Sequence, residues 1–427
     1  MKTKLYNAKI LTKDFTVIDG GLCVKDDTIM CVFEGDKCRD NDGDCAFDRE
    51  IDCGGNLLMP TFKNAHTHSA MTFLRSRADD LPLQQWLETQ VFPQEAKLTE
   101  EHIHWFTKLA ILEYLAGGIS AAFDMYFEPE AVATAAVDTG FRITMCGSVN
   151  NFGTTPENLH NFYKKYNGYN ELVAYKLGFH AEYTNSIDNM KQVAELSKQY
   201  GAPVYTHMSE TKAEVNGCFE RHGKSPATLF TELGLWEHGG GAFHAVHVER
   251  KDMKLMSERG VWAISCPGSN LKLASGIAPL MKMQSESMKI ALGTDGAASN
   301  NALSMFREMY FACTLQKHLQ GDAAACPATT VLEWATAGSA EAMGLANCDC
   351  LETGKKADIM MLDLSRPAMR PHNNLAKNVV YAGDTSAVKM TMVNGKVLYK
   401  DGVYTLADGT DSAHIIEKCE QLMRDFD

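Results

Sequence analysis

The middle of the chain alternates short apolar runs with longer helix-forming stretches. The helix-forming stretches include residues 101–115 and 189–200. Eight apolar runs, each followed by helix-forming sequence, lie at residues 56–60, 120–124, 142–146, 175–179, 203–206, 241–245, 261–264 and 289–293. Repeated βα units produce a parallel sheet covered by helices, and eight such units close into a barrel. The pattern therefore predicts an α/β protein with a (β/α)8 TIM barrel over residues 56–355, whose first strand is the run at residues 56–60.

Both ends of the chain have a sequence pattern that differs from the middle. Short strand-like runs separated by Asp and Gly lie at residues 16–21 and 22–33, and similar runs lie at residues 357–363 and 389–399. The last run is interrupted by Asn394-Gly395, a dipeptide typical of a two-residue hairpin turn. We therefore predict that residues 1–55 and 356–427 together build one small β-sandwich domain.

Composition excludes several classes of function. The 427 residues carry 41 Lys and Arg against 54 Asp and Glu, a net charge of −13, which argues against partners such as nucleic acid or an anionic membrane. No apolar run is long enough to span a bilayer, and the first ten residues lack a signal-peptide core. The 13 cysteines include no CxxC pair, so we expect reduced thiols and a cytoplasmic protein. The sequence is also compatible with assembly into a homo-oligomer.

Polar residues follow several of the predicted strands. Functional side chains converge at the carboxyl ends of the strands in a TIM barrel. His66 and His68 are two residues apart, so they point the same way on an extended chain, and His207 and Asp295 follow two later strands. Imidazole and carboxylate groups are ligands of divalent ions. We predict one divalent ion held by His66, His68, His207 and Asp295, with Zn²⁺ favoured and Fe²⁺ or Mn²⁺ also compatible.

Two further residues fit hydrolytic chemistry at such an ion. Glu210 lies three residues after His207 and is suited to transfer a proton from the attacking water to the substrate. His244 ends the sixth strand and is suited to assist the attack. His247 is a rival candidate, but it lies beyond the apolar run.

These residues, in this order, resemble the amidohydrolase superfamily, in the branch with one metal ion and no bridging carbamylated lysine. The resemblance covers nearly the whole chain. It is closest to the 5′-methylthioadenosine/S-adenosylhomocysteine deaminase group, near the chlorohydrolase-like enzymes, at residues 64–71, 78–83, 269–279 and 293–301. It implies a hydrolase that deaminates an adenine nucleoside and releases ammonia and the inosine analogue.

The resemblance also implies roles for individual residues. Glu210 would transfer protons and contact the substrate, with His244 and Asp295 assisting the attacking water. Glu95 would accept hydrogen bonds from the ribose hydroxyls, and Trp86 would form an aromatic wall. His180 matches a histidine that contacts the nucleoside.

Two departures from the group bear on the substrate. Close relatives carry an Arg shortly after the third strand, where this chain has Cys-Gly-Ser at residues 146–148, and Arg142 lies earlier in that strand. An Arg there would pair with the carboxylate of S-adenosylhomocysteine. Glu182 adds a carboxylate near the predicted site entrance. We therefore expect an uncharged 5′ group, as in 5′-methylthioadenosine or adenosine, over S-adenosylhomocysteine.

Other functions use the same metal set. Deamination or hydrolysis of a free base or a triazine-like ring, such as guanine, cytosine or 8-oxoguanine, is the main alternative. A metal-binding scaffold without activity is a remote one, because every predicted ligand and Glu210 is present. His180 and Glu182 imitate the HxE motif of zinc-dependent cytidine deaminases, but that fold also needs a PCxxC motif, which this chain lacks.

Overall fold

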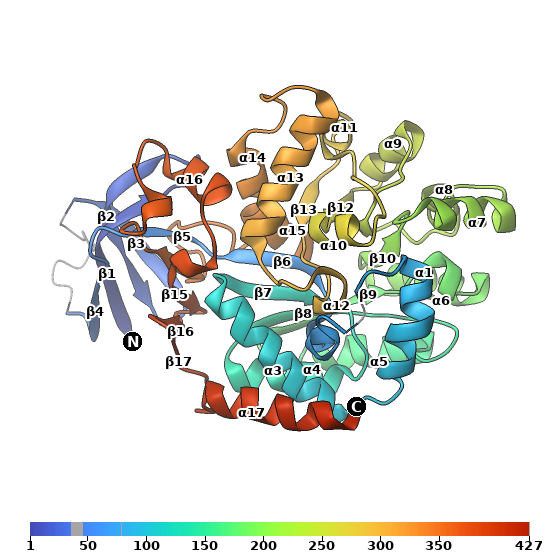
Figure 1. The fold of residues 1–427 in the computed structure, drawn as a ribbon, viewed down its shortest axis with the longest axis horizontal. Coiled ribbons are helices and arrows are strands. Elements are labelled where there is room, and N and C mark those ends of the chain that lie inside the picture. The colour runs from blue at the N-terminus through green and yellow to red at the C-terminus, as the bar shows by residue number, and fades with distance from the viewer. Residues whose placement is uncertain (36–45, 78, 427) are drawn as a thin grey trace.

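The computed structural model describes residues 1–35, 46–77 and 79–426; Cys38, Cys45 and Ala78, on which the sequence analysis drew, lie outside these ranges. Eight parallel strands form one sheet, with each strand beside the next in chain order (Figure 1). They are β6 (Phe62–Thr67), β7 (Ile119–Asp124), β8 (Arg142–Cys146), β9 (Val173–Gly178), β10 (Val204–Met208), β11 (Gly240–His244), β12 (Val261–Ser265) and β13 (Ile290–Leu292).

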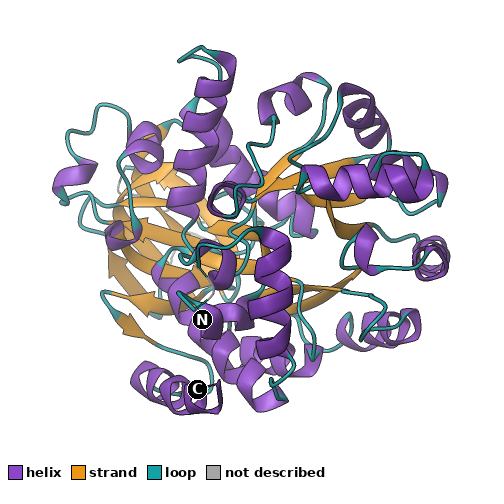
Figure 2. Cartoon of the chain, turned by 45° about the vertical axis from the view of Figure 1, so that its right-hand side comes forward, coloured by secondary structure: helices purple, strands orange, loops and turns teal. Residues whose placement is uncertain are grey.

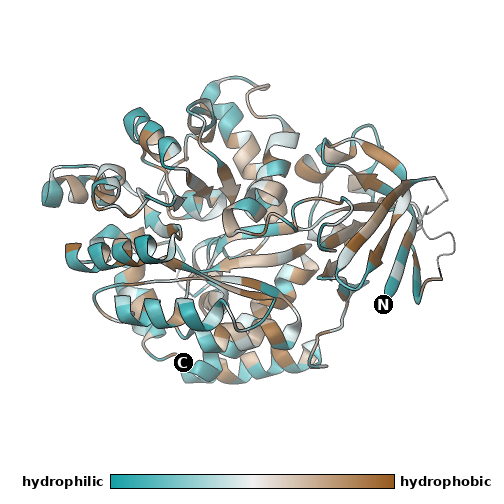
Figure 3. Cartoon of the chain, turned by 180° about the vertical axis from the view of Figure 1, so that it is seen from behind, coloured by the Kyte–Doolittle hydropathy of each residue, from teal (hydrophilic) through white to brown (hydrophobic). Residues whose placement is uncertain are grey.

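Helices cover the outside of this sheet (Figure 2). They include α3 (Glu100–Ala116), α4 (Pro129–Thr139), α6 (Ile187–Tyr200), α9 (Arg250–Glu258) and α13 (Met305–Gln320). Every residue of β7 and of β8 is buried, as expected where helices cover one face of a parallel sheet and the barrel interior fills the other. The outward sides of the helices are hydrophilic, whereas the strands are largely apolar (Figure 3). The predicted TIM barrel is confirmed.

The first barrel strand was predicted wrongly. The apolar run at residues 56–60 forms β5 (Leu57–Pro60), which pairs with β14 (Ile359–Leu362) in the other sheet. The next strand, β6, begins the barrel and carries buried Lys63, Asn64 and His66. Strand β6 does not read as an apolar run because it contains polar side chains that are buried in the barrel. The sequence pattern therefore assigned the first barrel strand to the neighbouring apolar run.

The first and last barrel strands are joined by a side chain. Among the described strands, no ladder connects β6 to β13. Instead, Asn64 Nδ2 donates to Thr294 Oγ1 (2.7 Å), and the Thr294 N–H donates to Asn64 Oδ1 (2.9 Å). The chains approach closely because Gly293 has no side chain: a Cβ there would lie 2.6 Å from the backbone nitrogen of His66. The barrel is therefore closed by a bridge between Asn64 and Thr294.

Within the described residues, the two ends of the chain build a second, mixed sheet of nine strands. Its first strands are β1 (Lys2–Leu11), β2 (Val17–Lys25), β3 (Thr28–Glu34) and β4 (Arg49–Asp52), and its last are β15 (Val388–Val393), β16 (Lys396–Lys400) and β17 (Val403–Tyr404). Blue and red strands accordingly lie side by side in Figure 1. Asn394 and Gly395 form the predicted hairpin turn, both with positive φ. The fold class is thereby confirmed, with a small β domain made from both termini.

The last helix leaves that sheet and lies on the barrel. Helix α17 (Ser412–Leu422) runs along α3, and Lys418 Nζ lies 2.8 Å from Glu101 Oε1. We propose that residues 1–55 with 356–427 and residues 56–355 form the two domains. The two separate sheets support this division except at β5, which belongs to the sheet made by the termini, and α17 crosses it.

Candidate active site

The structure brings the predicted ligands together at the carboxyl ends of the barrel strands. His66 and His68 come from the end of β6, His207 from β10, and Asp295 from the turn after β13. His68 Nε2 lies 3.3 Å and His66 Nε2 3.7 Å from Asp295 Oδ1, and the Nε2 atoms of His66 and His207 are 3.1 Å apart. The four side chains thus meet from three separate strand ends, in two overlapping groups that share His66: His66, His68 and His207, and His66, His244 and Asp295.

The outer ring nitrogens set the chemical form of these ligands. His68 Nδ1 donates to the carbonyl of Met125 (2.6 Å) and His207 Nδ1 to the carbonyl of His180 (2.8 Å). Each Nε2 is then left with a lone pair. Burial, followed by the neighbouring histidines, lowers the pKa of His66 and of His207 well below the ordinary value. Burial would lower the pKa of His68 too, but its hydrogen bond to Asp295 raises that pKa to about 9. The neutral imidazoles of His66 and His207, with His68 and the carboxylate of Asp295 beside them, fit a divalent cation.

Asp295 is held by a ring of hydrogen bonds. Its Oδ2 accepts from Ser269 Oγ (2.6 Å) and Ser299 Oγ (2.8 Å), and its Oδ1 accepts from the N–H of Gly296 (2.8 Å). Burial would raise the pKa of Asp295, but the nearby histidines, His68 first, hold it well below the ordinary value. The Asp295 carboxylate is therefore ionised and held in a fixed orientation.

Glu210 and His244 face each other beside this cluster. Glu210 follows β10 and His244 ends β11, and His244 Nε2 lies 3.8 Å from Glu210 Oε2. His244 Nδ1 pairs with Asn270 Oδ1 (2.8 Å), and Ser275 Oγ donates to Glu210 Oε1 (3.2 Å). Burial raises the pKa of Glu210, and His244 opposes that shift. A carboxyl group whose pKa is raised is better suited to general acid and base catalysis than an ordinary carboxylate.

Backbone strain marks the same strand ends. Ser209, His244 and Asp295 have φ values of 53°, 69° and 60°, in the left-handed region that non-glycine residues seldom adopt. Such strain is retained where the surrounding structure enforces it, and it concentrates at functional sites. These turns aim Glu210, His244 and Asp295 inward instead of continuing the direction of the strands.

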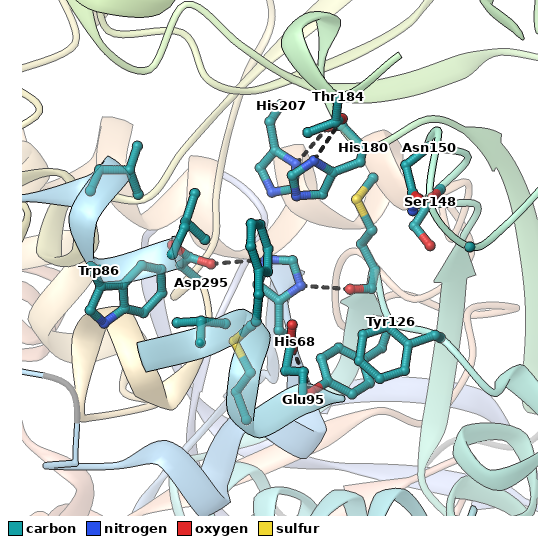
Figure 4. A pocket seen from close by; sticks show the side chains of 18 of the residues that line it. His68, Trp86, Glu95, Tyr126, Ser148, Asn150, His180, Thr184, His207 and Asp295 are labelled. Carbon is teal, nitrogen blue, oxygen red and sulfur yellow. Dashed lines mark hydrogen bonds and ion pairs between the residues drawn. The ribbon is translucent and has the colours of Figure 1, made fainter. Parts of the chain in front are cut away.

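His68, His207, Glu210, His244 and Asp295 line a cavity of about 570 Å³, a size that suits a small organic molecule (Figure 4). Much of the rest of the cavity lining, here called its wall, is apolar or aromatic. It includes Met71, Leu83, Trp86, Leu87, Val91, Phe92, Phe127, Phe152 and Leu273. Five of these come from residues 83–92, which run from α1 (Leu83–Trp86) through η2 (Leu87–Val91) to α2 (Phe92–Glu95). The site therefore combines a polar cluster with an apolar wall.

The predicted substrate-binding residues all line this cavity. Trp86 is buried in the wall, and His180 is half-buried next to His207, with burial lowering its pKa to about 4. Glu95 is half-buried and accepts a hydrogen bond from Tyr126 Oη (2.7 Å). Burial raises the pKa of Glu95 to about 7, although Tyr126 opposes that shift. Figure 4 shows Glu95 and Tyr126 together on one side of His68.

Several site residues were not predicted from the sequence. Tyr126 lies two residues after β7, and no functional residue was predicted at the end of that strand. Ser269, Asn270 and Ser275 belong to the stretch that carried the family resemblance, but no role was predicted for them. Their positions behind Asp295, His244 and Glu210 depend on contacts between distant segments. Only the position of Tyr126 after a barrel strand offered a usable signal.

The two residues that bore on substrate charge both lie away from the cavity. Arg142 pairs with Asp358 (3.4 Å) and does not line the cavity. The expectation for Glu182 was wrong: it is buried, and it pairs with His222 (2.9 Å) and with Arg221, whose Nε donates to it at 3.0 Å. Among the described residues that line the cavity, none is Lys or Arg. The walls therefore offer no cation to a substrate carboxylate.

A TIM barrel that gathers histidines, an aspartate and a glutamate at the carboxyl ends of its strands defines the class of metal-dependent barrel hydrolases. The model of the Amidohydrolase family matches residues 57–398. The chain belongs to this family.

Named relatives and solved structures agree with this assignment. A 5-methylthioadenosine/S-adenosylhomocysteine deaminase of Moorella thermoacetica is 37% identical over 417 residues, covering 94% of this chain and 97% of the relative. A zinc-bound crystal structure of an adenosine deaminase from Xanthomonas campestris superimposes with a TM-score of 0.92 at 31% identity, covering 99% of this chain and 98% of that one. A zinc complex of an atrazine chlorohydrolase from Arthrobacter aurescens has a TM-score of 0.88 over 99% of this chain and 100% of that one, but at 19% identity it supports the fold alone.

Within the described residues, no helix has the length and apolar character that crossing a bilayer requires.

Proposed function

We propose that this protein deaminates an adenine nucleoside by metal-dependent hydrolysis, with 5′-methylthioadenosine or adenosine as substrate. The observation that carries this proposal is that one cavity is lined both by a cluster suited to a divalent ion and by the carboxyl group of Glu95. A carboxylate that accepts hydrogen bonds from two neighbouring hydroxyls selects a ribose-bearing substrate over a free base. The names of the relatives support the same reaction.

The metal set we propose is one ion, Zn²⁺ in preference to Fe²⁺ or Mn²⁺, held by His66, His68, His207 and Asp295. The three imidazoles and one carboxylate suit Zn²⁺, and the solved adenosine deaminase that this chain resembles is zinc-bound. A divalent ion held there would lower the pKa of a bound water toward neutrality and so supply a hydroxide nucleophile.

The proton transfers fall to residues beside that set. Glu210 takes a proton from the attacking water and delivers it to the ring nitrogen next to the carbon that bears the amino group. His244 Nε2 faces the same space and stabilises the incoming oxygen by hydrogen bonding. As the tetrahedral adduct collapses, the proton of its new hydroxyl passes to the amino group and the bond from the ring carbon to that nitrogen breaks. Ammonia and the inosine analogue are released, so that one water is consumed for each ammonia formed.

The cavity wall favours an uncharged 5′ substituent. Phe127 and Phe152 line the cavity, and no Lys or Arg does so among its described lining residues. A methylthio group loses little on leaving water for such a wall, whereas a buried carboxylate without a partner is costly. S-adenosylhomocysteine, whose amino acid group is charged, is therefore the weaker substrate.

The test is ammonia release by the Zn²⁺-loaded protein from 5′-methylthioadenosine, adenosine, S-adenosylhomocysteine, guanine and cytosine. We expect turnover of the first two and little of the third. Activity on a free base alone would reject the nucleoside proposal while leaving the metal site in place. Stoichiometric zinc binding without ammonia from any of the five would favour the scaffold alternative.

A further inference from the structure

Glu214 is a buried carboxylate that lies directly behind Glu210. It occupies the first turn of α7 (Lys212–His222), where its own N–H donates to the N-cap Thr211 Oγ1 (3.1 Å). In an ordinary capping box, such a residue turns its side chain back to the N–H of the N-cap residue. Here it reaches further: Glu214 Oε1 accepts from the N–H of Ser209 (2.6 Å) and Oε2 from the N–H of Glu210 (2.8 Å).

The two N–H groups belong to the turn that aims Glu210. Ser209 has the left-handed φ of 53°, so the chain bends sharply between β10 and α7. Glu210 is thereby turned toward His244 and Ser275, at 3.8 Å and 3.2 Å. A carboxylate that accepts from two successive N–H groups fixes the orientation of the peptide unit between them.

The surroundings of Glu214 indicate that its carboxylate holds the turn before α7. It does not line the cavity, so it cannot touch a substrate there. Among the described residues it forms no ion pair, and its charged or titratable neighbours are Glu210, His244, Tyr183 and Cys218. A buried carboxylate beside a second carboxylate is unfavourable unless its hydrogen bonds compensate. Both of its oxygens are used on the Ser209–Glu210 turn.

We infer that Glu214 is a positioning residue, which holds the turn after β10 so that the Glu210 carboxylate stays within reach of the substrate. This inference rests on the proposed role of Glu210 in proton transfer. A displacement of about 1 Å at a catalytic group can lower turnover on the order of 100-fold. The loss should fall on kcat and leave KM for 5′-methylthioadenosine nearly unchanged.

The experiment compares E214Q and E214A with E210Q and with the double variant E210Q/E214Q. A glutamine can accept only one of the two N–H bonds. Because it keeps the size of the side chain, E214Q still tests the inference if E214A fails to fold. We expect E214Q to lower kcat on the order of 100-fold. The double variant should be no slower than E210Q, because a residue that acts through Glu210 has nothing left to position. E220Q is the matched control, because Glu220 is an exposed carboxylate on the same helix.

A crystal structure of E214Q supplies a readout that needs no substrate. We expect the Glu210 carboxylate to move away from His244 and Ser275 while the barrel and the metal ligands stay in place. An unmoved Glu210 would overturn the inference, as would multiplied losses in the double variant. If E210Q itself retained full turnover, the proposed role of Glu210 would fail, whereas displacement of Glu210 in the E214Q crystal would still be measurable.

Discussion

At the scale of single residues, Glu210 carries the sharpest prediction. We expect E210Q to lower kcat by about 10² to 10⁴-fold, the range that general acid and base catalysis contributes. The zinc content should stay at the wild-type level, because Glu210 is not one of the four proposed ligands. Turnover of 5′-methylthioadenosine and metal analysis of the purified variant check both statements. Wild-type turnover in E210Q would remove Glu210 from the mechanism.

Glu95 predicts a pH dependence of substrate binding. Burial raises its pKa to about 7, so its ionised fraction grows as pH rises from 6 to 8. The ionised form accepts hydrogen bonds from the ribose hydroxyls more strongly, so KM for 5′-methylthioadenosine should fall across this range, by up to about tenfold for a single titrating group. E95Q should show a higher KM without that dependence. An unchanged pH profile of KM in E95Q would assign the titration to another group.

What the sequence could predict at this scale depends on residue type and strand position. His66, His68, His207 and Asp295 are ligand-type residues next to apolar runs. The structure groups the three histidines, and it places Asp295 within 3.3 Å of His68 and in a second group with His66 and His244. Ser269 and Asn270 support Asp295 and His244 from 26 residues away in each case. Such contacts form only once the barrel closes, so no local pattern marks them. Glu182 shows the converse: its neutralisation by Arg221 and His222 was invisible in the sequence.

At the scale of elements, the end of the chain stabilises the barrel helices. Phe426, just beyond α17, is almost fully buried, and its ring centroid lies 4.8 Å from that of Phe73 and 5.0 Å from that of His102. Phe73 belongs to η1 (Ser69–Leu74), which directly follows the metal-site histidines. The C-terminal segment thus packs behind the element that begins at the site.

We expect F426A to lower the free energy of unfolding by about 3–5 kcal/mol, the usual cost of removing a buried phenylalanine ring. F219A is the control, because Phe219 is 49% exposed on α7, and a surface change of this kind should cost no more than about 0.5 kcal/mol. Urea denaturation measures both. Equal stability of the two variants would mean that the end of the chain does not support the fold.

The errors in element assignment have a physical cause. The run of residues 56–60 and the strand β6 follow each other with a single residue between them, yet they belong to different sheets. Apolar character identifies a buried strand but not the sheet that it joins. Strand β6 is itself marked by Lys63, Asn64 and His66, whose burial depends on partners in other strands. The periodic pattern therefore predicted the barrel correctly and its first strand wrongly.

At the scale of the whole molecule, a buried ion network joins the two sheets. Asp358, next to β14, lies 3.8 Å from Lys63 Nζ on β6 and 3.4 Å from Arg142 Nη2 on β8. It also accepts from Ser120 Oγ (2.8 Å) and from the N–H of Asn394 (2.8 Å). Arg142, considered above for substrate binding, thus serves the junction between the barrel and the small β domain.

We expect D358A to destabilise the protein by about 3–5 kcal/mol, because it leaves two buried cations without their partner. Since the network spans both sheets, the unfolding transition should shift as a whole. D401A is the control: Asp401 forms an exposed pair with Lys389 (2.8 Å), worth at most about 1 kcal/mol. Denaturation followed by circular dichroism and by tryptophan fluorescence tests this. Two separate transitions in D358A would show that the sheets unfold independently.

The bridge between Asn64 and Thr294 has a consequence for the metal. These residues are 230 positions apart, and the proposed ligands lie on both sides of the same junction, His66 and His68 on one and Asp295 on the other. An ion bound there would act as a removable cross-link that ties the two ends of the barrel sequence, and loops of this length are costly to close. We expect chelation to speed hydrogen exchange first at β6 and β13. The same ion would then both activate water and hold the first and last strands of the barrel together.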